Sequence, residues 1–180
     1  MSTKYIHKVL FIIPFFLLFA CDSSIEDVEG TPLNPVPLRS FTADEVMTKT
    51  QKDAFKYFWD YANSTSKLAL ERVHFDGSGY DNNLIATGGS GFGLMNILVG
   101  INRGFVTRAE AVTRLQTALN WLENADRFHG AWAHWYKADT GTPVMIFAKD
   151  DGADIVETAF LCEGLICVRE YFKSGNAAEQ

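Results

Sequence analysis

The chain has 180 residues, a net charge of −6 and a sequence pI of about 5.2. This length is enough for one domain with a core of its own. The acidic balance and the lack of a basic block argue against nucleic acid as a partner.

The first twenty residues have the pattern of a signal peptide. Lys4 and Lys8 precede an apolar run from Val9 to Ala20, which is too short to span a membrane comfortably. The run ends in Leu-Phe-Ala-Cys21, which resembles a bacterial lipobox and implies cleavage before Cys21 and lipidation of that residue. The alternative is an ordinary signal peptide with an incidental cysteine. Lipid chains on Cys21 would tether the protein to a membrane surface without a transmembrane helix.

Residues 21–40 are acidic and then rich in proline, with almost no apolar periodicity. We expect them to form an extended tether. The folded part is expected over residues 41–180. It should contain four helices, at about 43–62, 90–103, 108–126 and 151–173.

Capping signals fix two of the expected helix starts. Thr42 with Glu45, and Thr107 with Glu110, each form a capping-box pattern. Gly104 is a helix stop. Without a repeated βα unit, these helices indicate an all-α protein. If the helices pair antiparallel, the starts of the second and fourth lie at the same end.

The connection before the fourth helix should contain a small β-hairpin. Residues 132–136 and 144–147 alternate in polarity around an Asp-Thr-Gly turn at 139–141. The earlier Gly-rich stretch 86–93 lacks the Gly-Lys-Ser/Thr that a phosphate loop would need. Close approach of the backbone to a ligand or to another helix is the better interpretation.

The fourth helix carries the chain's densest group of acids. Asp150, Asp154 and Glu157 are spaced i, i+4, i+7, which places them on one face of a helix that starts near 151. The same stripe continues through Leu161, Leu165 and Val168, and the helix should be buried nearly all round. Acids also favour helix N-termini for capping alone. That explanation suits Asp150 and Asp151, but it suits Glu157 poorly.

Aromatic residues precede this acidic helix in the run Arg127–Tyr136. Flat aromatic faces stack on the C–H faces of sugar rings, and His, Arg and Asp side chains can bond the hydroxyls. The alternative is that Trp132 and Trp135 anchor the loop in the core, and that His129 and His134 make structural hydrogen bonds. No histidine pair has helical ligand spacing, and no Cys/His cluster suggests zinc. Acids, aromatics and export together favour a carbohydrate site.

Three blocks in order resemble the bacterial glycoamylase-like lipoproteins, which are similar to glycoside hydrolase family 144. They are TGGSGFGLMNILVGINRGFVTRAEAVTRL, ADRFHGAWAHWYKADTG and KDDGADIVETAFLCEGL. The resemblance implies an (α/α)6 barrel, endo-β-1,2-glucanase activity, an inverting mechanism and no metal or other cofactor. It implies a catalytic acid or base at Asp154 or Glu157, with the other binding substrate or tuning its partner. The implied substrate-binding residues are Asp150, Asp151, Phe128, His129, Trp132, His134, Trp135, Gly89 and Ser90.

A complete barrel of this kind needs six helical hairpins, and about four helices are expected here. The chain therefore resembles the N-terminal portion of the enzyme, with a further cleft acid expected beyond Gln180 and no activity expected from this portion alone. The rival functions are α-glucan hydrolysis and non-catalytic glycan binding by a surface lipoprotein. The expected partners are a β-glucan and, through Cys21, a membrane of the cell envelope.

Overall fold

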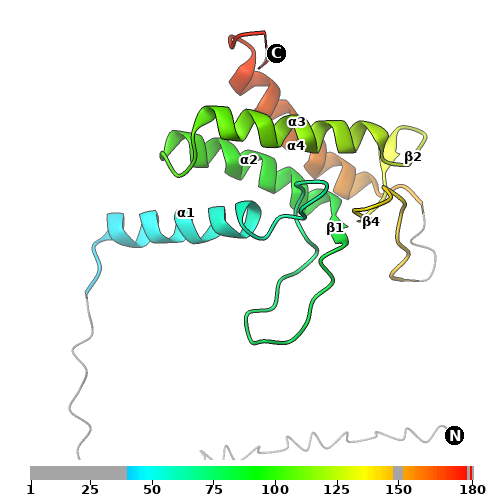
Figure 1. The fold of residues 1–180 in the computed structure, drawn as a ribbon, viewed down its shortest axis with the longest axis horizontal. Coiled ribbons are helices and arrows are strands. Elements are labelled where there is room, and N and C mark those ends of the chain that lie inside the picture. The colour runs from blue at the N-terminus through cyan, green and yellow to red at the C-terminus, as the bar shows by residue number, and fades with distance from the viewer. Residues whose placement is uncertain (1–39, 148–151, 178, 180) are drawn as a thin grey trace, which may run out of the picture. The chain divides into compact units, whose positions relative to one another are not determined.

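The computed structural model describes residues 40–147, 152–177 and 179. From Phe41 onward they belong to one unit, Phe41–Gln180. The expected signal peptide, Cys21, nearly all of the expected tether, Asp150 and Asp151 lie outside the described residues. The described part contains four helices and two pairs of short strands (Figure 1), which confirms the all-α class.

Helix α1, Ala43–Trp59, begins at the capping box expected from the sequence. Thr42 Oγ1 accepts the Glu45 N–H at 3.2 Å, and the Glu45 carboxylate accepts the Thr42 N–H at 2.9 Å. Both groups would otherwise lack a partner at the helix start. The helix ends earlier than the expected residue 62, with Asp60 as its C-cap.

Helix α2, Thr87–Asn102, starts before the expected residue 90, because the first glycines of the Gly-rich stretch are already helical. Gly104, with φ of 69°, follows its end as expected. Gly100 makes room for the core. A Cβ there would lie 2.2 Å from Cε2 of the buried Phe55 of α1, so the ring packs directly on the α2 backbone.

Helix α3, Arg108–Asn124, begins at the second capping box, between Thr107 and Glu110. Four residues of its predicted apolar stripe are buried, namely Ala111, Leu115, Ala118 and Leu122. Leu119, which was predicted to share that stripe, is 39% exposed. The buried face of α3 is therefore narrower than the sequence pattern indicated.

Helix α4 spans Ile155–Phe172, so the predicted start near residue 151 is wrong. Asp154 is its N-cap in an extended conformation, and the predicted helical alignment of Asp154 with Glu157 does not exist. The prediction of burial nearly all round is also wrong. Leu161 and Val168 are buried, but the opposite side exposes four apolar residues, Ile155, Val156, Phe160 and Ile166.

The strands connect distant parts of the chain. Strand β1 (Leu84–Ala86) pairs antiparallel with β4 (Trp135–Lys137), and β2 (Arg127–Phe128) pairs with β3 (Ala131–Trp132). The predicted hairpin around residues 139–141 exists only in part. An isolated bridge joins Tyr136 to Pro143, while no strand is assigned at 144–147.

Helices α2 and α4 approach so closely that their backbones touch. A Cβ on Gly91 would lie 2.2 Å from the Phe160 carbonyl oxygen, and one on Gly164 would lie 2.4 Å from the Gly91 oxygen. Their starts lie at the same end of the unit (Figure 1), as expected. Within the described part of the chain, no helix is long and apolar enough to cross a membrane.

Candidate active site

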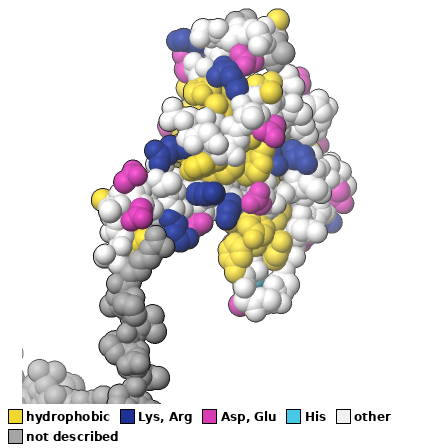
Figure 2. Space-filling model, turned by 60° about the vertical axis from the view of Figure 1, so that its left-hand side comes forward, with side chains coloured by type: hydrophobic (Ala, Val, Ile, Leu, Met, Phe, Trp, Pro, Cys, Tyr) yellow, Lys and Arg dark blue, Asp and Glu magenta, His cyan; other side chains and the backbone are white. Residues whose placement is uncertain are grey.

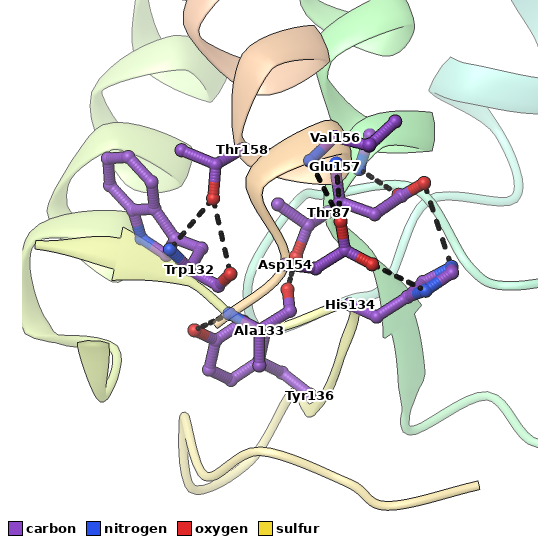
Figure 3. A network of polar contacts seen from close by, with 10 residues as sticks. Thr87, Trp132, Ala133, His134, Tyr136, Asp154, Val156, Glu157 and Thr158 are labelled. Atoms are coloured by element: carbon purple, nitrogen blue, oxygen red, sulfur yellow. Dashed lines mark hydrogen bonds and ion pairs between the residues drawn. The ribbon is translucent and has the colours of Figure 1, made fainter. Parts of the chain in front are cut away.

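Asp154 caps helix α4 with one carboxylate oxygen. Its Oδ1 accepts the N–H groups of Val156 and Glu157 at 2.9 and 3.0 Å, so it satisfies two of the helix's otherwise unpaired donors. Its own N–H donates to the Trp132 carbonyl at 2.8 Å. The capping explanation offered for Asp150 and Asp151 thus applies to Asp154, which is held rigidly from both its backbone and its side chain (Figure 3).

Glu157 reaches across to the start of helix α2. Its Oε2 accepts the Gly88 N–H at 2.7 Å, in the first turn of α2, where the helix dipole attracts a negative group. Ala86, the N-cap of α2, makes no side-chain capping bond. A carboxylate from 69 positions further along the chain therefore serves as part of the cap.

His134 joins the two acids. Its Nδ1 lies 3.2 Å from Asp154 Oδ2, and its Nε2 lies 3.7 Å from Glu157 Oε1 (Figure 3). Its ring stacks on that of Trp135, with centroids 3.4 Å apart and planes 10° apart. Because Trp135 is only 7% exposed, it forms a fixed support for the imidazole.

The loop that carries His134 is pinned to both helices. Thr87 Oγ1 donates to the Ala133 carbonyl at 2.5 Å, and the Thr87 N–H donates to the His134 carbonyl at 3.0 Å. Thr158 Oγ1 accepts the Trp132 N–H at 3.0 Å. These bonds fix the loop relative to the acids (Figure 3), so the side chains of His134, Asp154 and Glu157 form one rigid group.

Of the four oxygens on the two acids, Glu157 Oε1 is the least engaged. It lies beyond hydrogen-bond distance of His134, whereas the other three each have a closer partner. The side chain of Glu157 is 18% exposed. This oxygen is therefore the one best placed to meet a ligand.

A further acid, Glu71, lies near this group and was not anticipated from the sequence. A hydrogen bond from Arg72 lowers the pKa of Glu71, and the charges of Arg72, His74 and His134 lower it further, against the opposing effect of burial. Glu71 follows Leu70, which forms a β-bridge with Ile85 of β1. The pairing that brings Glu71 here has no local sequence signal.

The predicted aromatic residues separate into two groups. Trp132 is half-buried and its indole N–H donates to the Leu122 carbonyl at 3.3 Å, so it anchors the loop as the core interpretation expects. Phe128 is 62% exposed at the end of β2, and its ring meets His129 edge-on at 4.3 Å. His129 has a φ of 52° in the turn between β2 and β3. Phe128 and His129 therefore face solvent.

In the Gly-rich stretch, the residue in contact with an acid is not one of the two that were predicted to bind substrate, Gly89 and Ser90. Ser90 is 2% exposed, and its Oγ donates to the Ala86 carbonyl at 2.6 Å and accepts the Ala69 N–H at 3.1 Å. Its buried hydroxyl therefore bonds two backbone groups of the core. Gly89 would make only ordinary contacts with a Cβ, the nearest at 3.6 Å. Gly88 is the glycine that touches an acid, and the sequence analysis did not single it out.

Among residues 40–147, 152–177 and 179, no group of three or more His, Cys, Asp or Glu side chains has the arrangement of a metal site. The side chains of His134, Asp154 and Glu157 are linked by ion-pairing contacts. Together they can hold a carboxylate in one orientation and present one of its oxygens.

Comparisons with known proteins find similarity to glycoside hydrolases. No protein-family profile matches the chain. An endo-β-1,2-glucanase from Chitinophaga pinensis, solved with sophorotriose and glucose, is 46% identical and superimposes with a TM-score of 0.75 over 78% of this chain and 34% of its own. An exo-β-1,2-glucooligosaccharide sophorohydrolase from Parabacteroides distasonis is 38% identical over 92% of this chain and 22% of its own length. A Bacteroides caccae structure provisionally named a glucoamylase is 48% identical, with a TM-score of 0.74, over 77% of this chain and 34% of its own.

The chain is homologous to one segment of β-1,2-glucan hydrolases. The resemblance of the three sequence blocks to these hydrolases is thereby confirmed, whereas the lipoprotein part of it stays a prediction. The barrel class is confirmed too, because the β-1,2-glucan hydrolases similar to the chain are (α/α)6 barrels that the chain covers in part. The chain spans about a fifth to a third of the length of these β-1,2-glucan hydrolases.

Proposed function

We propose that this chain forms part of the substrate cleft of an endo-β-1,2-glucanase, with Glu157 as one of its catalytic carboxyl groups. The observation that carries the proposal is the placement of Glu157. Its Oε2 is bound at the start of α2, and its Oε1 faces His134. This arrangement lies in a segment 46% identical to an endo-β-1,2-glucanase.

In this proposal the neighbours of Glu157 position it. Asp154 caps α4, on whose first turn Glu157 lies, and holds His134 from the other side. An inverting hydrolase needs two carboxyl groups about 6.5–9.5 Å apart, one to protonate the leaving oxygen and one to activate water. Glu157 Oε1 is the better placed of the two acids to supply one of them, because both oxygens of Asp154 are already bonded.

The test of catalysis uses a chimera, because the chain spans about a third of the solved glucanase. Residues 41–180 replace the corresponding segment of the Chitinophaga pinensis enzyme, and reducing-sugar release from linear β-1,2-glucan is measured. Glu157→Gln should lower kcat by about 10²–10⁴ or more with an unchanged circular dichroism spectrum. Asp154→Asn should also lower kcat, through loss of positioning.

Near-normal turnover by Glu157→Gln would place the chemistry on another residue. Starch and β-1,3-glucan serve as control substrates. The second candidate, α-glucan hydrolysis, has the name of the Bacteroides caccae structure in its favour. Faster release of reducing sugar from starch than from β-1,2-glucan would favour α-glucan hydrolysis.

We also propose that the protein is a lipoprotein of the cell envelope, anchored through Cys21. The support is the apolar run that ends in Leu-Phe-Ala-Cys21. Palmitate labelling in cells should mark the wild-type protein and not Cys21→Ser. Equal labelling of both would refute the anchor.

A further inference from the structure

A second concave site lies at the C-terminal end of α1. It has a volume of about 290 Å³ and is lined by Asp53, Lys56, Tyr57, Tyr61 and Phe75. Small-molecule sites usually hold about 300–1,000 Å³. The size therefore suits one sugar residue better than an oligosaccharide.

Exposed aromatic rings form one side of this pocket. Phe75 is 73% exposed and Tyr61 is 37% exposed. Their centroids lie 5.3 Å apart with the planes at 84°, so the pair presents a ring face and a ring edge. Figure 2 shows hydrophobic side chains gathered on the lowest lobe of the described part, which is the loop 71–83 that hangs lowest in Figure 1. Exposed aromatic patches are typical of interaction surfaces, including ligand-binding grooves.

Charged side chains form the other side. Asp53, on α1, pairs with Lys49 one turn earlier, and Lys56 lies on the same helix one turn before Asp60. Hydrogen bonds between a neutral hydroxyl and a charged group such as these are stronger than hydrogen bonds between two neutral groups. An aromatic platform facing charged hydrogen-bonding groups is complementary to a pyranose, which has apolar C–H faces and a rim of hydroxyls.

The pocket connects to the candidate active site through one short segment. Tyr57 Oη donates to the Leu70 carbonyl at 3.0 Å, and the next residue is Glu71. Burial raises the pKa of Tyr57, and the charge of Glu71 raises it further. The charge of His134 in turn helps to lower the pKa of Glu71. Glu71 is thus within electrostatic reach of both the pocket and His134.

We propose that this pocket is a subsite that binds one glucosyl unit of a glucan chain whose scissile bond lies at Glu157. The inference rests on the proposed function and adds to it. It implies a substrate chain that is long enough to occupy both the pocket and the site at Glu157. Phe75 and Tyr61 stack on the sugar, while Asp53 and Lys56 bond its hydroxyls.

The test is affinity electrophoresis of the full chain in native gels that contain linear β-1,2-glucan. The wild-type chain should be retarded, and sophorose, which is too short to span both places, should compete weakly. The double variant Tyr61→Ala/Phe75→Ala should bind the polymer about tenfold more weakly. Tyr61→Phe/Phe75→Trp, which keeps both aromatic faces, should restore the retardation. Phe41→Ala removes a 52% exposed aromatic at the opposite end of α1 and should leave the retardation in the gel unchanged.

Equal retardation of the wild type and the double variant would overturn the subsite and leave the proposed function in place. Retardation by soluble starch instead of β-1,2-glucan, lost in the double variant, would keep the subsite and overturn the β-1,2 linkage. A wild-type chain that is retarded by neither polymer would overturn the subsite.

Discussion

Gly88 is the residue on which the orientation of Glu157 depends most directly. A Cβ at this position would lie 2.5 Å from Glu157 Oε2 and 3.0 Å from its carboxyl carbon, closer than real Cβ atoms approach their neighbours. The atoms in the way belong to the end of a flexible side chain. An added methyl group should therefore displace the carboxylate and leave the helix intact.

We expect Gly88→Ala to change the melting temperature of the chain by only a few degrees, because the helix propensity that alanine gains over glycine, up to about 1 kcal/mol, offsets much of the loss of the Glu157 cap, about 0.5–2 kcal/mol. In the chimera, the same change should lower kcat about tenfold or more, since Glu157 loses its bond to the α2 backbone. Gly89→Ala is the matched control, because its Cβ would meet nothing nearer than 3.6 Å. Equal losses in both variants would assign the effect to the Gly-rich turn as a whole.

The sequence predicted the residue types of the site better than their roles. Asp154, Glu157 and His134 were singled out, and the structure brings all three together. The helical argument that linked Asp154 to Glu157 is wrong, because Asp154 precedes the helix. Gly88 could not be found, because its partner is remote in the sequence and any glycine in that stretch looks equivalent.

At the scale of elements, the contact between α2 and α4 determines where the two acids stand. The helices touch through backbone at Gly91 and Gly164, and the Gly88–Glu157 bond lies at the same end of the pair. A change that separates the helices should consequently weaken both the fold and the site.

Gly164→Ala should lower the free energy of unfolding by about 1–3 kcal/mol, because its Cβ would lie 2.4 Å from the Gly91 carbonyl oxygen, a backbone atom that cannot rotate away. The loss should appear despite the better helix propensity of alanine. Urea denaturation measures it. Gly79→Ala, whose Cβ would meet nothing within 4 Å, is the control. Equal midpoints for Gly164→Ala and the wild type would show that the helices can move apart at little cost.

Helices with local signals were predicted well, and pairings over long distances were not. The capping boxes at Thr42 and Thr107 fixed two helix starts to the residue. The pairing of β1 with β4 was missed, because each strand has only three residues and its partner lies about fifty positions away. The start of α4 was misplaced, because acids favour both the cap and the first turn of a helix.

At the scale of the whole molecule, exposed residues of α2 and α4 form a notable apolar surface. They are Phe92 and Val99 on α2 with Val156, Phe160 and Ile166 on α4, and we call them the α2/α4 face. The rings of Phe92 and Phe160 lie 5.3 Å apart, so the exposed residues of the two helices meet at this point. Leu161 and Val168 of α4 are buried and do not belong to this face.

We expect the 180-residue chain to self-associate and to bind a hydrophobic dye, because exposed apolar area of this kind favours burial by about 25 cal/mol per Å². Light scattering over a concentration series and dye fluorescence measure the two effects. Phe160→Glu, at a 42% exposed position, should reduce both without changing the helix content. A monodisperse chain that binds no dye at any concentration would contradict the expectation.

The bond between Gly88 and Glu157 also has a consequence for biosynthesis. The two residues lie 69 positions apart, and ribosomes add about 5–20 residues per second. The first turn of α2 is therefore made roughly 3–14 s before the carboxylate that caps it. During that interval the Gly88 N–H lacks the carboxylate that it bonds in the folded chain. The same bond that orients the acid thus forms late in translation, and the site exists only once α4 has left the ribosome.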